Sequence, residues 1–416
     1  MFDLDGMFFD CVFMGKDRVC HCKYCQDKFK KETGFDHIPI SEQDTGYEEY
    51  VVWAHKCYDD YRVLFAKAVH KGNKDIPVSM NWGYSARCPE SIPKDIDFLT
   101  QDCWPTNIVA AEQVQSKNWA FASKPYELMN NMSLQWWNSY EVKPYETLVQ
   151  ECVLPMINGG KTWMGFQLYQ NHLTDPATMD MVKRVFTYIK NIEGNFDNKR
   201  VLPYVGVLCD ESQLVNRRGT GVDEMDVDLT SLYGLNRALT ASGIPYNSVN
   251  EKFLIENADD FKLIIISNDQ YVSAELYEKL KFYVSKGGSV LFTGKSGCVD
   301  INGNRVENEN FKELTGVSIT GQYDYPYAYI SPKHKSLTYA IMPKSVLCAD
   351  SFMKVKQCTA ETVATVTLPY KKVKEINWGE FPSFSNPWTQ TEDAAVCINK
   401  YGNGTVCYAC ADVFRG

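Results

Sequence analysis

The chain has 416 residues, of which 44% are hydrophobic and 23% charged, with a net charge of −9. This length suits two or three domains with cores of their own. The acidic balance argues against a nucleic-acid partner, and no apolar run reaches the ~18 residues that a membrane span needs. The 15 cysteines are irregularly spaced outside one cluster, so we expect free thiols, a reducing compartment and a cytoplasmic location.

Residues 1–195 are predicted to alternate short apolar strands with helices. Asp175 followed by Pro176 is a typical helix start. Five strands joined by helices define an α/β region, whereas a closed (β/α)8 barrel needs eight strands. We therefore expect the C-terminal part of a TIM barrel, about strands 4–8, that lacks an N-terminal portion. The strands are expected at 7–13, 76–82, 96–99, 126–129 and 162–168, and the helices at 47–70, 145–157 and 176–192.

Residues 200–416 are predicted to form a second α/β domain. Leu229, Leu232, Leu235 and Leu239 share one face of an expected helix. Alternation of buried strands with such helices favours a parallel, doubly wound sheet. From 300 to 395 the pattern changes to strands and loops, followed by a closing hairpin. The strands are expected at 201–208, 263–266, 289–292, 395–398 and 405–410, and the helices at 229–241 and 274–285.

Two carboxylates are candidates for catalysis. Asp10 follows the apolar residues Phe8 and Phe9, which is how a barrel strand delivers a partly desolvated acid at its C-terminal end. Glu127 is expected near the end of a later strand, so the pair could flank a glycosidic bond. Alternatively, Asp10 caps the next element and Glu127 is a surface residue. Weaker competitors in the same region are Asp97, Asp102 and Glu112.

Aromatic residues and one amide near the expected strand ends are candidates for substrate binding. Sugars stack their C–H faces on aromatic rings, and an amide supplies hydrogen bonds to hydroxyl groups. A single Trp is more often a core residue, so the prediction is made for the group. Its members are Asn81, Trp82, Trp104, Trp136 and Trp137.

Cys20, Cys22 and Cys25 form a C-x-C-x-x-C cluster. Three thiolates at this spacing suit a tetrahedral zinc ion that needs one more ligand. The fourth ligand could be Cys11, His21, Cys57 or a residue outside this sequence. The alternative is a set of free thiols.

Several of these segments resemble glycosidase families. Residues 4–10, with the sequence LDGMFFD, look like the fourth barrel strand of α-L-fucosidases, where D-G-x-x-F-D ends in the nucleophile. Glu127, Trp136, Trp137 and Tyr140 resemble an E…W-G-Y segment of the same enzymes, although Asn138-Ser139 replaces the glycine. Residues 156–160, MINGG, look like the end of their V-x-x-G-G helix, with Met in place of Val. The cysteine cluster resembles a zinc site of family 42 β-galactosidases.

The second predicted domain also resembles part of a glycosidase family. Residues 201–411 look like the trimerisation domain of family 42 β-galactosidases, which has a glutamine-amidotransferase-like (flavodoxin-like) fold. The combination is typical of the group called hypothetical glycosyl hydrolase 6, related to the family 151 and family 29 fucosidases. One departure weakens the β-galactosidase interpretation, because Phe9-Asp10 stands where family 42 has Asn followed by the acid/base Glu.

The resemblance implies a retaining glycoside hydrolase of α-L-fucosidase type that acts on a glycoside or oligosaccharide. Asp10 would be the nucleophile and Glu127 the acid/base or a substrate-contacting carboxylate. It further implies a homotrimer and a structural zinc ion, with no cofactor needed for catalysis. The alternatives are a β-galactosidase-like hydrolase with Glu127 as nucleophile, and an inactive carbohydrate-binding or assembly protein.

Overall fold

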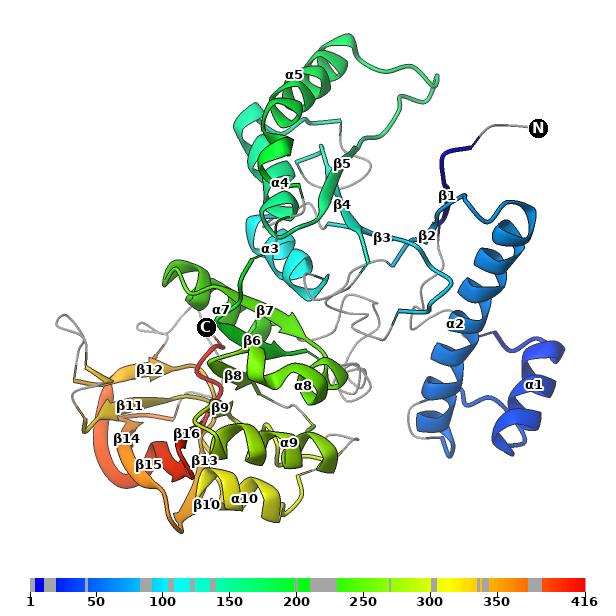
Figure 1. Ribbon diagram of the computed structural model, residues 1–416. Coiled ribbons are helices and arrows are strands. Elements are labelled where there is room, and N and C mark those ends of the chain that lie inside the picture. Colours follow the sequence, from blue (N-terminus) through cyan, green and yellow to red (C-terminus); the bar gives the residue numbers. More distant parts are fainter. Residues whose placement is uncertain are drawn as a thin grey trace. The chain divides into compact units, whose positions relative to one another are not determined.

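The computed structural model divides the chain into two compact units, the first reaching Val201 and the second starting at Leu202 (Figure 1). Each unit is described by itself. No helix among the described residues is long and apolar enough to cross a membrane. The structure describes residues 4–10, 20–41, 44–82, 92–103, 108–119, 124–134, 140–197, 199, 201–209, 230–268, 271–300, 305–334, 337–338, 344–372 and 384–415.

The first unit alternates strands with helices, as the sequence predicts. The helices predicted at 145–157 and 176–192 are confirmed, and the long helix predicted from 47 extends to Gly72. The side chain of Asp175 accepts a hydrogen bond from the backbone N–H of Thr178, which confirms the predicted helix start. The elements are β1 (Met7–Phe9), α1 (Lys23–Thr33), α2 (Tyr47–Gly72), β2 (Val78–Met80), β3 (Leu99–Asp102), α3 (Ile108–Trp119), β4 (Tyr126–Asn131), α4 (Tyr145–Ile157), β5 (Lys161–Gly165) and α5 (Pro176–Ile192).

The five strands run parallel and lie side by side in chain order. β1 pairs with β2, and β3, β4 and β5 form a second ladder. A parallel bridge between Asn81 and Thr100 joins the two ladders. The third strand begins three residues later than predicted. Asp97 precedes it, and its carboxylate accepts a hydrogen bond from the backbone N–H of Val78 instead of extending the strand.

One face of these strands is apolar and the other is polar. Because side chains alternate along a strand, Val78, Met80 and Trp82 point to one face, and Ser79 and Asn81 to the other. The apolar face packs against helices, including Ala66 of α2 and Trp119 of α3. Figure 1 shows α2 beside β2, and α3, α4 and α5 along β3, β4 and β5. Among the residues that the structure describes, the helices pack on the apolar face, which leaves the polar face to carry a site.

The second unit holds a nine-stranded sheet in the order β12-β11-β14-β15-β16-β9-β8-β6-β7. The part from β16 to β7 is parallel, as predicted, and the remaining strands are antiparallel. β10 and β13 form a separate antiparallel pair. The elements are β6 (Val205–Leu208), α7 (Thr230–Ala241), β7 (Tyr246–Val249), α8 (Glu251–Asn257), β8 (Leu263–Ile266), α9 (Ala274–Ser285), β9 (Ser289–Thr293), α10 (Glu309–Thr315), β10 (Val317–Gln322), β11 (Ala328–Pro332), β12 (Val346–Cys348), β13 (Met353–Gln357), β14 (Glu361–Pro369), β15 (Pro387–Tyr401) and β16 (Gly404–Ala409).

Candidate functional site

Three polar side chains meet at the carboxyl ends of the first three strands. Asp10 directly follows β1, Asn81 directly follows β2, and Asp102 is the last residue of β3. The strand register and the alternation of side chains place all three on the polar face. Parallel strands deliver their carboxyl ends to one edge of a sheet, which is where α/β proteins carry their binding sites.

Asn81 links the two carboxylates. Its Nδ2 donates a hydrogen bond of 2.8 Å to Oδ1 of Asp10, and its side chain also hydrogen-bonds Asp102. Burial raises the pKa of Asp102 to about 6, and the nearby Asp10 charge adds to this rise, whereas the bond from Asn81 opposes it. Asp10 is exposed, whereas Asp102 is half-buried. The two carboxyl groups therefore share one donor but lie in different surroundings.

Glu127 lies further down the same polar face. It is the second residue of the six-residue β4, so the prediction that it lies at a strand end is wrong. Its Oε1 accepts a hydrogen bond of 3.0 Å from Oγ1 of Thr100, and Thr100 in turn accepts one of 3.0 Å from Ser79. Burial raises the pKa of Glu127, and the bond from Thr100 opposes the rise. The three side chains form a row across β2, β3 and β4.

Of the four tryptophans predicted to bind substrate, the structure describes one, Trp82. Trp82 is fully buried on the apolar face, and the Arg62 guanidinium carbon lies 4.4 Å from its ring centroid. Its predicted role as a sugar platform does not fit, because strand alternation turns it away from Asn81 and into the core. The predicted binding residues Trp104, Trp136 and Trp137 lie outside the described residues.

The cysteine cluster does converge. The sulfur atoms of Cys20, Cys22 and Cys25 all lie within 4.8 Å of one another, at the start of α1. Backbone and side-chain hydrogen bonds from the neighbouring cysteines lower the pKa of Cys22, whereas burial raises that of Cys25 to about 12. Of the fourth ligands considered, Cys57 Sγ accepts a hydrogen bond of 3.2 Å from Lys28, and Cys11 lies outside the described residues. The three thiols fit three corners of a tetrahedral zinc site.

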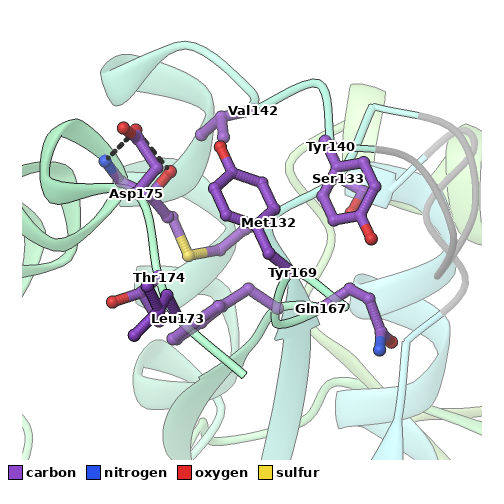
Figure 2. A pocket seen from close by; sticks show the side chains of 11 residues that line it. Met132, Ser133, Tyr140, Val142, Gln167, Tyr169, Leu173, Thr174 and Asp175 are labelled. Carbon is purple, nitrogen blue, oxygen red and sulfur yellow. Dashed lines mark hydrogen bonds between the residues drawn. The ribbon is translucent and has the colours of Figure 1, made fainter. Parts of the chain in front are cut away.

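A pocket lies at the carboxyl ends of β4 and β5, which sequence analysis did not identify. It is lined by residues that follow these strands and by the first turn of α5 (Figure 2). The rings of Tyr140 and Tyr169 face it from two different loops, with centroids 5.2 Å apart. Tyr140 stands in a segment singled out for its tryptophans, but nothing in the sequence pairs it with Tyr169.

A buried ion pair supports this end of β4. Lys143 Nζ lies 3.1 Å from Oε2 of Glu151, and the two side chains are 2% and 0% exposed. Lys143 also donates to the backbone carbonyl of Asn131, the last residue of β4. Burial raises the pKa of Glu151 to about 7, although the Lys143 charge opposes this rise. The pair therefore anchors the strand end next to the pocket.

The chain matches no family profile and no curated protein, but solved structures share its fold. An α-L-fucosidase isoenzyme 2 from Paenibacillus thiaminolyticus is 18% identical with a TM-score of 0.77, covering 100% of this chain and 59% of that one. A β-galactosidase from Bacillus circulans sp. alkalophilus is 16% identical with a TM-score of 0.73, covering 96% and 66%. A GH42 β-galactosidase from G. stearothermophilus is 16% identical with a TM-score of 0.72, covering 95% and 64%.

These comparisons define the class of fold. The chain has a mixed α/β fold that it shares with glycosidases of TIM-barrel families. It spans between 59% and 66% of the length of these three solved chains. At these identities the likeness concerns the fold, and the chemistry has to be argued from the side chains.

Proposed function

We propose that this protein is a retaining glycoside hydrolase whose nucleophile is Asp10. The observation that carries the proposal is the pair of carboxyl groups, Asp10 and Asp102, that share the amide of Asn81 at the carboxyl edge of the sheet. Glycosidases use two such groups, one as a carboxylate and the other as an acid with a raised pKa. The unequal surroundings of Asp10 and Asp102 supply that difference.

The shared amide also limits the separation of the two carboxyl groups. One bond from Asn81, to Asp10, measures 2.8 Å, and Asp102 accepts a second from the same side chain. A common donor brings one oxygen of each carboxyl group to the same place. Retaining glycosidases place their carboxyl groups ~5–5.5 Å apart, whereas inverting enzymes need ~6.5–9.5 Å to admit a water molecule. We propose the shorter separation, and with it retention, because the two groups share one donor.

The proposed reaction has two steps. Asp10 attacks the anomeric carbon and forms a glycosyl ester, while protonated Asp102 gives its proton to the leaving oxygen as the glycosidic bond breaks. Asp102, now ionised, then takes a proton from water, whose oxygen attacks the same carbon and releases the sugar from Asp10. Both groups return to their starting states.

Glu127, predicted from the sequence as acid/base, takes a different part in this proposal. It lies three strands away from Asp10 and in hydrogen-bonded contact with Thr100, so we assign it to the polar row that lines the floor of the site. A second candidate, a β-galactosidase-like hydrolase with Glu127 as nucleophile, is supported by its placement on the polar face and by the β-galactosidase neighbours. An inactive carbohydrate-binding protein is the third candidate.

The substrate proposed first is an α-L-fucoside, on the fold match and on the segment that ends in Asp10. The full chain would be assayed with an aryl α-L-fucoside and an aryl β-D-galactoside, following the anomer released by NMR. Release of the α-anomer of fucose supports the proposal. Release of β-galactose alone favours the second candidate, and binding without turnover favours the third.

We also propose that the first unit is the C-terminal part of a TIM barrel and that the second is a flavodoxin-like trimerisation domain. In chain order, the parallel strands β6, β7, β8, β9 and β16 are arranged 2-1-3-4-5, the order of flavodoxin-like sheets. Light scattering of the full chain at micromolar concentration should give the mass of a homotrimer. A monomer at that concentration would remove the assembly from the proposal.

A structural zinc ion held by Cys20, Cys22 and Cys25 completes the proposal. Elemental analysis should find about one zinc per chain. Cys22→Ser should lose the metal and lower the melting temperature, whereas Cys358→Ser, at an exposed cysteine of the second unit, should change neither. Metal-free wild-type protein would contradict this part. The described cysteines are free thiols, in keeping with the cytoplasmic location expected from the sequence.

A further inference from the structure

The carboxyl end of β3 accepts a hydrogen bond from a helix that packs on the opposite face of the sheet. Nε2 of Gln115, a residue of α3, donates to the backbone carbonyl oxygen of Asp102 over 3.1 Å. Gln115 is only 2% exposed, and α3 packs on the apolar face through Trp119. A buried side chain of the helix therefore holds the backbone of the residue that carries the proposed acid.

This bond lies just beyond the part of β3 that is paired with β2. The N–H of Trp82 donates to the carbonyl of Thr100 over 3.0 Å, so this carbonyl points toward β2. Residues two apart in a strand direct their backbone groups to the same neighbour, so the carbonyl of Asp102 points to the same side as that of Thr100. There the amide of Gln115 supplies a donor, which fixes the strand end at the position where the site begins.

The carboxyl group of Asp102 depends on where this strand end lies. It shares the amide of Asn81 with Asp10, whose charge also acts on it. The other groups that meet it from β4 and α3, its register partner Met129 and Gln115, are neutral. A hydrogen bond weakens steeply when its geometry is lost, and a displacement of ~1 Å at a reacting group can cost about a hundredfold in rate.

We propose that Gln115 is a positioning residue for Asp102: by holding the carbonyl oxygen of that residue, it keeps the carboxyl group beside Asn81 and partly shielded from water. The inference rests on the proposed function, which makes Asp102 the proton donor. Gln115 acts through Asp102 and takes no part in bond cleavage itself. Because a buried hydrogen bond also stabilises the fold, the test has to separate positioning from stability.

The test compares Gln115→Ala with Gln113→Ala, a matched change on the same helix. Gln113 accepts a hydrogen bond of 3.1 Å from Nδ2 of Asn158, so each variant loses one side-chain hydrogen bond, but only that of Gln115 reaches Asp102. Gln115→Ala lets the strand end relax and water reach the carboxyl group, which lowers the pKa of Asp102 toward its ordinary value.

The expected result is a change in kcat and in the pH profile. For the glycoside that is cleaved, Gln115→Ala should lower kcat by about tenfold, leave KM within about twofold, and move the alkaline limb of kcat/KM lower by about one pH unit. Gln113→Ala should move neither kcat nor the limb. Gln115→Met fills the same space without a donor and should lower kcat as well, so it repeats the measurement if Gln115→Ala does not fold.

Titration of the carboxyl group separates this inference from the proposed function, because it requires no turnover. The full chain is labelled with ¹³C at Cγ of aspartate, and the NMR signal of Asp102 is assigned by its loss in Asp102→Asn. The pKa of Asp102 should be lower by about one pH unit in Gln115→Ala and unchanged in Gln113→Ala. This result in a protein whose wild type hydrolyses no glycoside would support the positioning role and overturn the proposed function.

The other outcomes count against Gln115. Hydrolysis by the wild type, with the same limb and the same Asp102 titration in Gln115→Ala, keeps the function and overturns the positioning role. Equal losses of kcat in Gln115→Ala and Gln113→Ala, with the Asp102 titration unmoved, would show that Gln115 only stabilises the fold. Absence of both hydrolysis and the shift overturns both proposals.

Discussion

Each unit of this chain contains a ladder of parallel strands, but central strands of the two ladders differ in their polar side chains. In the second unit, β6 and β8 consist of Val205–Leu208 and Leu263–Ile266, runs without a polar side chain whose residues are almost all buried. In the first unit, one face carries Ser79, Thr100 and Glu127 in a hydrogen-bonded row. Buried polar groups destabilise a fold unless they are paired, so a sheet that keeps such a row serves chemistry as well as stability. The contrast agrees with the proposal that the first unit carries the catalytic site.

The largest expected effect follows from replacing the proposed nucleophile. Asp10→Asn should lower kcat on an aryl α-L-fucoside by about a thousandfold or more, because a neutral amide cannot form the glycosyl ester. Asp75→Asn makes the same change at an exposed residue before β2, at the opposite edge of the sheet, and should leave kcat unchanged. Steady-state kinetics of the two variants checks this. Comparable activities would remove Asp10 from the mechanism.

The next effect concerns pH. Asp102 acts while protonated, and its pKa is raised to about 6, so kcat/KM should fall as pH rises through about 6. Asp102→Asn should abolish this alkaline limb and lower activity on a saccharide by about a hundredfold, more than on an aryl glycoside whose leaving group needs no proton. Asp95→Asn, in the turn before β3, is the control and should keep the limb. A limb that persists in Asp102→Asn would assign the acid to another group.

A smaller effect tests the anchor of β4. Lys143→Met leaves the buried Glu151 without its partner and should cost about 3–5 kcal/mol in the free energy of unfolding of the first unit. Because the pKa of Glu151 is about 7, the loss should be larger above that pH, where the carboxyl group is ionised, and smaller below it.

Lys161 provides the matched control for that measurement. Its ion pair with Asp197 is exposed, with side chains 60% and 53% accessible, so Lys161→Met should cost no more than ~1 kcal/mol. Urea denaturation at two pH values measures both variants. Equal losses would show that the buried pair does not anchor the strand.

The smallest expected effect belongs to Glu127. In the polar row, Glu127 accepts a hydrogen bond from Thr100 and so helps to position the side chains of the site. Glu127→Gln keeps the shape of the side chain and should lower kcat by about tenfold or less. The same assay as for Asp10→Asn measures it. A loss of about a thousandfold would instead make Glu127 the nucleophile, as in the β-galactosidase-like alternative.

Much of the first unit could be predicted from the sequence, because its strands are short apolar runs and its long helices carry clear starts such as Asp175-Pro176. Two helices, α1 and α3, were not predicted. In α1 only Phe29 is buried, so no apolar periodicity marks it. β4 extends through Asn130 and Asn131, which have low strand propensity, and for that reason Glu127 was placed too near its end.

The site was predicted only in part, because its geometry depends on contacts between distant residues. Asp10 and Asn81 were recognised individually from their positions after strands. Their hydrogen bond joins residues 71 positions apart, and Asp102 gains its role only through that same amide. Sequence also shows that Trp82 is aromatic but not which face of the strand it occupies, and register decides between the core and the site.

The central claim is that Asp10, on the polar face of the first unit, becomes covalently bonded to the sugar. A fluorinated glycosyl fluoride slows the second step of a retaining enzyme, so the full chain can be incubated with the α-L-fucosyl form of this reagent, digested, and mapped by mass spectrometry. We expect a single fucosyl label on the peptide that contains Asp10, and no label in the Asp10→Asn variant. A label on Glu127, or on any residue of the second unit, would contradict it.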